Sequence, residues 1–382
     1  MKKIWKFLSY VLVAALAAAG TFAYTWYTDE VSKLDELAGL IEERFIGEYD
    51  ETLMEDAAAH AMVASLGDEW SYYIPAADYA AHVEQMNNAY VGIGITILAR
   101  EDGAGFEVTK VNEGGPAEEA GMLPGDLIIA VEGQSVADMT TTEARDLVRG
   151  EPGTQVLLTI QRAGETFDLP VTRKEVQNPV ASAQMLENNI GLVTIFNFDA
   201  RCASETIAAI EQLLGEGAQA LIFDVRFNPG GYKDELVDVL DYLLPEGPLF
   251  RSEYYTGAEY VDESDEKCLE IPMAVLVNDS SYSAAEFFAA ALSEYDWAII
   301  AGTQTYGKGY FQTTIELNDG SAVGLSVGRY TTPNGVSLAG VGITPEVYVE
   351  VDEETYWEIY AGILDPAEDP QIQAAAKALL NP

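Results

Sequence analysis

The first strong pattern along the chain is a mostly apolar run from residue 7 to residue 27. Its length suits a bilayer span, and three lysines before it and two acidic residues after it place the following domains outside the cytoplasm. A cleaved signal peptide is the alternative, because small residues such as Ala17 and Ala19 offer a cleavage site. The run exceeds the usual apolar region of about 7–15 residues in signal peptides, which favours an uncleaved anchor over residues 1–28. We therefore predict a single-pass protein of the cell membrane, or a secreted one if the segment is cleaved.

Helical periodicity dominates the next region, residues 29–89. Apolar side chains recur every three or four positions at 31–41 and again at 53–64, which is the spacing of amphipathic helices. Both histidines of the chain, His60 and His82, fall in this region. We expect each to be a helix-surface or interface residue rather than a catalytic one.

Residues 90–174 have a different texture, with short apolar runs broken by glycine and proline. Such runs predict strands separated by turns. The expected strands cover 91–98, 105–111, 127–131, 156–162 and 167–171, with a helix at 142–149 capped by Thr142. The region therefore reads as a compact, mostly β domain.

From residue 175 to residue 351, strands alternate with helices, which predicts a layered α/β core. The last segment, 352–382, is acidic and expected to be helical. Within the core, the expected strands are 191–198, 220–225, 273–277, 297–301 and 311–317, and the expected helices are 204–214 (capped by Ser204), 234–244 and 284–295.

Composition narrows the classes of partner. The chain has 20 basic and 63 acidic residues and a net charge of −43. This charge repels nucleic acid and disfavours broad contact with anionic lipid. Two cysteines, Cys202 and Cys268, are too few for a disulfide framework or a structural zinc site. We expect two free thiols, although a single bridge between them stays open.

The placement of histidine limits the hydrolytic mechanisms. Residues 83–382 contain none, so neither a Ser-His-Asp triad nor a Cys-His pair fits there. The two histidines do not form the H-E-x-x-H metal motif, and no metal site is predicted. A serine–lysine mechanism stays open, because a desolvated lysine can lose its proton near neutral pH.

Two segments supply that pair. Ser283 follows the buried strand 273–277 where a helix begins, and a helix N-terminus offers free N–H groups and partial positive charge. The neighbouring Ala284 is small enough to admit a substrate backbone. The alternative is that Ser283 only caps the helix. Lys308 lies between two glycines, where an exposed loop lysine is the alternative, and Gln312 could orient its amine.

A third segment, Pro229-Gly230-Gly231, follows the buried strand 220–225. Its glycines can turn a backbone N–H toward a bound carbonyl, and that N–H together with the N–H of Ala284 would form an oxyanion hole. The alternative is a plain strand-to-helix turn.

In the β domain, the sequence resembles a PDZ domain of bacterial proteases. The resemblance lies in Gly92-Ile93-Gly94-Ile95 and in the glycine-rich stretch at 115–126. It implies that Gly92, Ile93, Gly94 and Ile95 bind peptide, because a glycine-containing loop can hold a terminal carboxylate and the next strand edge can pair with an extended chain.

The three core segments together resemble the C-terminal processing (tail-specific) peptidase family. The Ser283–Lys308 spacing of 25 (308 − 283) and the segments at 332–335 and 340–346 fit that family. Glu346 stands where aspartate is commoner, and Phe227 replaces a more usual polar residue. The resemblance assigns Ser283 as nucleophile, Lys308 as base, Gln312 as its orienter, and Ala284 with Gly231 or Gly230 as oxyanion donors.

The resemblance also implies an α/β core of the crotonase/ClpP-like type, with an inserted or preceding PDZ domain. The expected activity is a serine endopeptidase that forms an acyl-enzyme and needs no metal or cofactor. Its expected partners are proteins or peptides with apolar C-termini, and homo-oligomerisation stays open. The alternatives are a non-catalytic PDZ scaffold that only binds tails and an acyl-CoA thioester enzyme.

Overall fold

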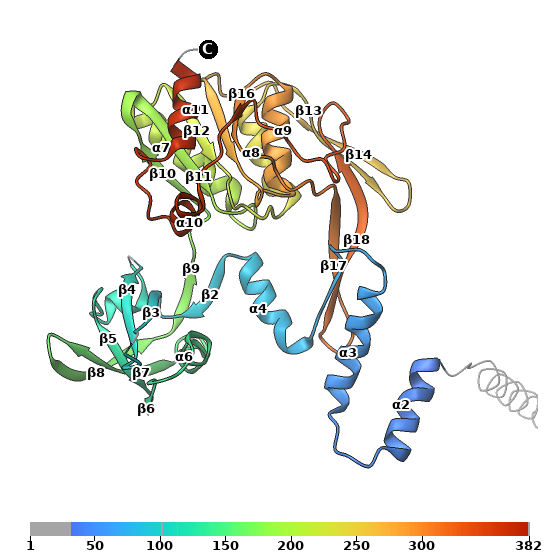
Figure 1. The fold of residues 1–382 in the computed structure, drawn as a ribbon, viewed down its shortest axis with the longest axis vertical. Coiled ribbons are helices and arrows are strands. Elements are labelled where there is room, and N and C mark those ends of the chain that lie inside the picture. Colours follow the sequence, from blue (N-terminus) through green and yellow to red (C-terminus); the bar gives the residue numbers. More distant parts are fainter. Residues whose placement is uncertain (1–31, 101, 113, 381–382) are drawn as a thin grey trace, which may run out of the picture. The chain divides into compact units, whose positions relative to one another are not determined.

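The computed structural model describes residues 32–380 except 101 and 113 (Figure 1). The described chain divides into two compact units, whose boundary in the sequence lies between Ala61 and Met62. The expected anchor at 1–28 lies outside the described residues. Among the described residues, no helix combines the length and apolar character needed to cross a bilayer.

Helices α2 (Lys33–Arg44) and α3 (Glu51–Ala64) cover the periodic segments of the first region. Ser32 and Asp35 form a capping box that fixes the start of α2. The expectation of helix throughout 29–89 is wrong at β1 (Tyr72–Ile74), which pairs antiparallel with β18. Helix α4 (Ala76–Met86) follows it. Local periodicity could not reveal β1, because its partner lies about 250 residues away in sequence.

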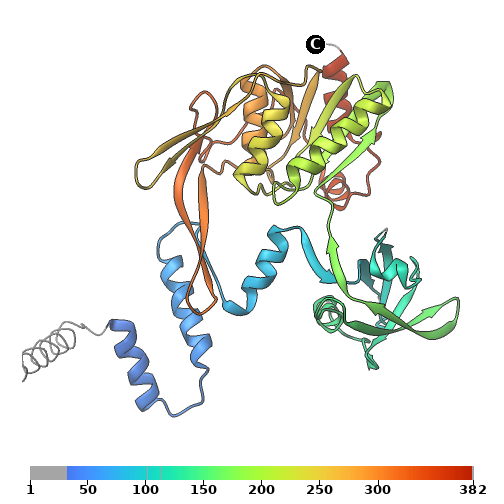
Figure 2. The ribbon, with the colours of Figure 1, turned by 180° about the vertical axis from the view of Figure 1, so that it is seen from behind.

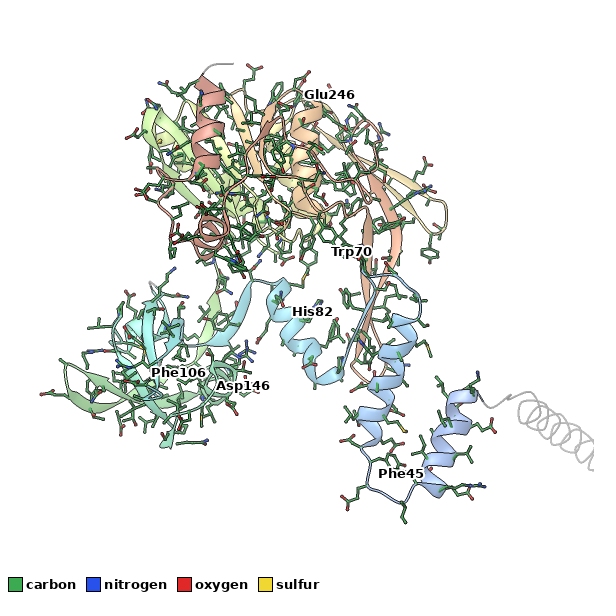
Figure 3. All side chains as sticks on the ribbon, viewed as in Figure 1. Phe45, Trp70, His82, Phe106, Asp146 and Glu246 are labelled. Carbon is green, nitrogen blue, oxygen red and sulfur yellow. The ribbon has the colours of Figure 1, made fainter. Side chains whose placement is uncertain are left out.

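The β domain is an antiparallel sheet in the order β3-β4-β5-β7-β8. Alternating residues of these strands pack with α6 around Phe106, which Figure 3 labels. The expected strand at 91–98 is two strands, β2 and β3, and the helix cap is Thr140 rather than Thr142, because Thr140 accepts the Glu143 N–H. The elements are β2 (Ala89–Gly92), β3 (Ile95–Ala99), β4 (Phe106–Val111), α5 (Pro116–Glu119), β5 (Leu127–Val131), β6 (Gln134–Ser135), α6 (Thr141–Val148), β7 (Gln155–Arg162), β8 (Glu165–Thr172) and β9 (Lys174–Gln177).

The predicted α/β core is confirmed. Its sheet has the order β10-β11-β12-β15-β16-β19, parallel from β11 to β19. Alternate residues of β12 and β15 face α7, α8 and α9 on one side and α11 on the other (Figure 2). The elements are β10 (Ala181–Met185), β11 (Ile190–Ile195), α7 (Cys202–Glu216), β12 (Ala220–Asp224), α8 (Lys233–Leu243), β15 (Met273–Val277), α9 (Ala284–Glu294), β16 (Ala298–Gly302), β19 (Val347–Tyr348), α10 (Glu353–Ala361) and α11 (Pro370–Leu380).

A second sheet, with the order β1-β18-β13-β14 and with β17 also paired to β18, completes this unit. It is formed by β13 (Gly247–Tyr254), β14 (Glu259–Ser264), β17 (Tyr310–Glu316) and β18 (Ala322–Thr331), together with β1. Strands β12 and β15 are adjacent and parallel, so the turns that follow them lie at the same edge of the sheet. These turns carry the predicted site residues Gly230, Gly231 and Ser283.

Two local expectations in the core have clear outcomes. Ser204 does not cap α7, because the helix begins at Cys202 and the Ser204 hydroxyl donates to the carbonyl of Arg201. Arg201, in the left-handed conformation, occupies the cap position instead. Both cysteines are free, as expected, with Cys202 fully buried and Cys268 partly exposed.

Candidate active site

Ser283 lies in a strained turn between the end of β15 and the start of α9. Its backbone has φ 59° and ψ −126°, a conformation that costs a non-glycine residue about 1–3 kcal/mol and that concentrates at functional sites. Every residue of α9 from Ala284 to Leu292 is buried, so the helix cannot relax to relieve the strain. The turn therefore holds the serine in one fixed position.

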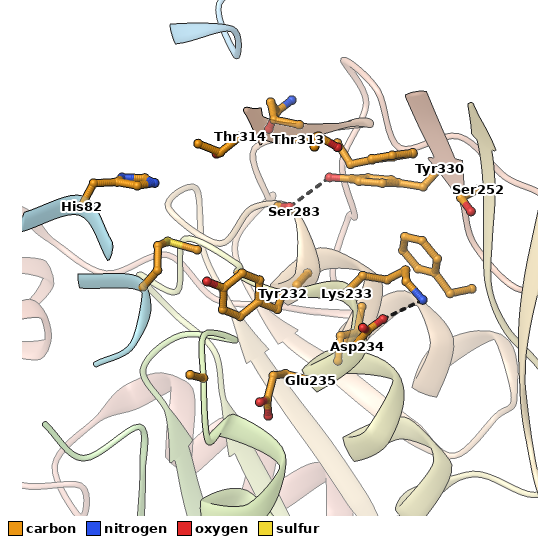
Figure 4. Close-up of a pocket in the computed structure, with 18 of the residues that line it drawn as sticks. His82, Tyr232, Lys233, Asp234, Glu235, Ser252, Ser283, Thr313, Thr314 and Tyr330 are labelled. Carbon is orange, nitrogen blue, oxygen red and sulfur yellow. Dashed lines mark hydrogen bonds and ion pairs between the residues drawn. The ribbon is translucent and has the colours of Figure 1, made fainter. Parts of the chain in front are cut away.

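The Ser283 hydroxyl does not act merely as a helix cap. Its Oγ forms a 3.0 Å hydrogen bond with the hydroxyl of Tyr330, from β18. The Tyr330 ring is buried against Phe287 and stacks on Phe311. Burial raises the pKa of Tyr330, so its phenol stays neutral. Figure 4 shows this bond at the wall of a pocket of about 780 Å³, with His82 and Tyr232 farther along it.

The glycine turn after β12 packs directly on the Ser283 turn. A Cβ at Gly230 would lie 2.7 Å from the Ser283 Cβ and 3.0 Å from the Ala284 nitrogen. The Tyr282 N–H donates to the carbonyl of Asn228 at 3.2 Å, which joins the two turns. Both predicted donor segments thus meet at Ser283.

The two glycines differ in what their N–H groups do. The Gly230 N–H donates to Asn228 Oδ1 at 2.8 Å, so it is occupied. The N–H groups of Gly231 and Ala284 have no partner among the described residues. Gly231 and Ala284 are consequently the pair that remains available to a substrate carbonyl.

Lys308 lies in the loop between β16 and β17. Its Nζ is 4.3 Å from the centre of the Trp70 ring. Burial lowers the pKa of Lys308 to about 8, against the opposing effect of the Asp68 and Glu286 carboxylates. No hydrogen bond joins Lys308 Nζ to Ser283 Oγ within the described part of the chain. The structure thus brings the two residues into one site without joining their reactive atoms.

Glu286 connects the Ser283 turn to the Lys308 loop. Its Oε2 accepts the N–H groups of Ser283 (3.1 Å) and Lys308 (2.9 Å). Its Oε1 accepts from the Thr305 hydroxyl (2.6 Å) and the Gly307 N–H (2.7 Å). Burial raises the pKa of this fully buried carboxyl, and the four hydrogen bonds oppose that rise.

Sequence reasoning missed Glu286, although a signal was present. It stands three residues after Ser283, in the Ser-x-x-Glu pattern of helix starts. Gln312, predicted to orient the lysine, instead donates from Nε2 to Ser326 Oγ at 3.0 Å and to the Tyr310 carbonyl at 3.3 Å. Among the described residues, Gln312 forms no hydrogen bond with Lys308. Tyr330 and Trp70 carried no local signal in the sequence.

The predicted peptide-binding residues of the β domain lie together. Gly92, Ile93, Gly94 and Ile95 line a groove of about 360 Å³ beside helix α6. Strand β3 pairs only with β4, so its other edge is free among the described strands. A free strand edge beside a helix can accept an extended peptide as an added strand.

The two histidines differ in placement. His60 is exposed on α3, as expected for a helix-surface residue. His82 lines the pocket that contains Ser283 and packs beside Tyr72 and Tyr79, and burial lowers its pKa.

Comparison with known proteins adds independent information. The model of peptidase family S41 matches residues 189–349, and a PDZ domain model matches residues 107–162. The "Carboxy-terminal processing protease CtpA" of Bacillus subtilis is 33% identical over 369 residues, covering 92% of this chain and 79% of that protein.

Other relatives agree. A Staphylococcus aureus protein named "Probable CtpA-like serine protease" is 29% identical, covering 91% of this chain and 73% of its own length. The solved structure of a Bacteroides fragilis protein assigned to the S41 proteases has a TM-score of 0.54 at 18% identity, covering 88% of this chain and 92% of that one. At that identity the structural match shows the fold alone.

Proposed function

Because the chain belongs to peptidase family S41, as a serine-type C-terminal processing peptidase, we propose that Ser283 is its nucleophile and Lys308 its general base. The observation that carries the proposal is the shared carboxylate of Glu286, which accepts the backbone N–H of both residues. A lysine with a pKa of about 8 is partly uncharged near neutral pH, and an uncharged amine can accept the serine proton.

The reaction begins with movement of the lysine side chain. Its four-carbon stem is flexible, so the amine can turn from Trp70 toward Ser283 while the Glu286 contacts hold its backbone. The Ser283 hydroxyl then leaves Tyr330 and transfers its proton to Lys308 Nζ as Oγ attacks a substrate carbonyl. The proton passes on to the leaving amine, an acyl-enzyme forms, and water activated by the same lysine releases the new C-terminus.

The oxyanion formed in both steps is bound by the free N–H groups of Gly231 and Ala284. Each preorganised donor of this kind is worth about 2.7–4 kcal/mol of transition-state stabilisation. The α9 N-terminus adds partial positive charge at the same place. Gly230 has a different role, because its small size permits the approach of the two turns.

The PDZ domain is proposed to bind apolar C-terminal tails of protein substrates. The support is the groove lined by Gly92, Ile93, Gly94 and Ile95 beside the free edge of β3. We further propose that the segment 1–28 anchors the protein in the cell membrane with its catalytic part outside the cytoplasm. These proposals describe where and on what the peptidase acts.

The test uses Ser283→Ala and Lys308→Ala in the full chain. Each variant is expected to lose cleavage of an apolar-tailed peptide by at least about 10³-fold, as removal of a nucleophile or its base does in serine proteases. Labelling of Ser283 by a fluorophosphonate should fall in parallel, and thermal unfolding should confirm intact folding. Turnover at the wild-type rate by either variant would refute the assignment.

Two further assays, binding of the tail peptide and hydrolysis of an acyl-CoA, separate the rival functions. A non-catalytic scaffold would bind the tail peptide but leave both the peptide and the fluorophosphonate unreacted. A thioester enzyme would hydrolyse acyl-CoA faster than peptide.

A further inference from the structure

Three aromatic residues from distant segments gather beside Lys308, and the proposed reaction does not use them. We call Trp70, Tyr282 and Tyr306 the aromatic cluster. The Trp70 ring lies 4.3 Å from Lys308 Nζ. The rings of Tyr306 and Tyr282 pack on Trp70 at 5.4 and 6.0 Å and on each other at 5.8 Å. Trp70 is labelled in Figure 3.

The backbone around Trp70 is anchored so that the ring has a fixed position. Asp68 accepts the Trp70 N–H at 3.3 Å and the Ser71 hydroxyl at 2.5 Å. Ser71 Oγ in turn accepts the N–H of Ser326 in β18 at 3.1 Å. Gln312 donates to the Ser326 hydroxyl, so the residue predicted to orient the lysine supports the turn that carries Trp70.

The ring binds one protonation state of the lysine. A cation over the face of tryptophan is attracted by the ring's quadrupole, whereas a neutral amine gains little. The carboxylates of Asp68 and Glu286 act on Lys308 and also favour the ammonium, and the phenol rings of Tyr282 and Tyr306 pack on Trp70. Burial opposes all of these.

We propose that Trp70 is a positioning residue of the lysine: it holds the protonated side chain away from Ser283 and releases the neutral amine to it. This inference rests on the proposed function of Lys308 as the base. It explains why Ser283 Oγ bonds Tyr330 while the amine lies on Trp70. Such an arrangement makes the protonated enzyme inactive by geometry as well as by charge.

The experiment measures the rate of Ser283 labelling by a fluorophosphonate across the neutral to alkaline range. It compares Trp70→Phe, Trp70→Leu and, as a matched control, Trp357→Leu on the exposed face of α10. Loss of the ring destabilises the ammonium form of Lys308. The acid limb of the pH–rate profile of Trp70→Leu should therefore move to lower pH by roughly 0.5–1 unit. Trp70→Phe should show a smaller shift, and the control none.

The direction of the shift decides the inference. With an unchanged alkaline plateau, Trp70→Leu should react faster than wild type on the acid side, which a loss of packing cannot produce. A shift to higher pH, or an equal loss at every pH, would overturn the inference and make Trp70 a shield against water.

Lys308→Ala, measured alongside, separates the two claims. Wild-type labelling in Lys308→Ala would refute the base itself. If Lys308→Ala is not labelled and the pH profile of Trp70→Leu matches that of the wild type, only the role of Trp70 is refuted.

Discussion

The Ser283 turn and the Lys308 loop hold their reactive groups by different means. Ser283 is fixed by its backbone, in a strained conformation at the start of a helix that is buried from Ala284 to Leu292. In Lys308 only the backbone is held, by the hydrogen bond from its N–H to Glu286. The amine lies at the end of a flexible side chain, against the Trp70 ring. The difference teaches that the proposed nucleophile is preorganised, whereas the proposed base is placed by a side chain that can move.

If this comparison is right, a change that displaces the Ser283 turn should lower kcat more than a change elsewhere in the site. Gly230→Ala would put a Cβ 2.7 Å from the Ser283 Cβ at a residue with φ +90°. The serine must then shift, and a displacement of about 1 Å at a reacting group costs on the order of 10²-fold in rate. We expect kcat to fall by that factor or more in a peptide-cleavage assay.

The control for this variant is Gly217→Ala at the end of α7. Gly217 also has positive φ, at +99°, but a Cβ there meets nothing within 4 Å. It should lose some stability, as measured by denaturant unfolding, and keep its kcat. An equal loss of kcat in both variants would show that general strain, not displacement of Ser283, is responsible.

A smaller effect is expected where the two regions are joined. Glu286→Gln keeps the size of the side chain but replaces one acceptor oxygen by a donor, so buried N–H groups lose their partner. Each such loss costs about 1–3 kcal/mol of unfolding free energy. A similar loss in the transition state would lower kcat roughly tenfold.

Denaturant unfolding and steady-state kinetics together check this prediction. Glu205→Gln is the matched control, because Glu205 also accepts a backbone N–H, from Val180, but lies in α7. Wild-type kcat in Glu286→Gln with reduced stability would mean that Glu286 supports the fold without aligning the two regions.

The residues in the turns after β12 and β15 were easier to predict from the sequence than the side chains that surround Ser283 and Lys308. Ser283, Ala284 and the glycines lie where buried apolar strands end, which a linear pattern can reveal. Trp70 reaches the site through pairing of β1 with β18, across more than two hundred residues, and Tyr330 contacts Ser283 from 47 residues farther along the chain. No local pattern encodes either contact. The N-caps of α6 and α7 were predicted at the wrong residues because several neighbouring polar residues are equally plausible caps by sequence alone.

Chemical replacement of Lys308 tests most directly whether its uncharged amine is the base. In a Cys268→Ser background, which removes the partly exposed thiol, Lys308→Cys would be made and then aminoethylated to restore a lysine-like but more acidic amine. Cys202 is buried, and burial raises the pKa of its thiol to about 12, so it should stay unmodified. Mass spectrometry should confirm that only the cysteine at position 308 is aminoethylated.

The readout is the pH dependence of kcat/KM. For the wild type, activity should rise with pH through about 8, because the base works only after it loses its proton. The unmodified Lys308→Cys should be inactive, and aminoethylation should restore cleavage with the acid limb moved to lower pH. Activity before aminoethylation, or a restored enzyme whose limb stays at the wild-type pH, would contradict the account.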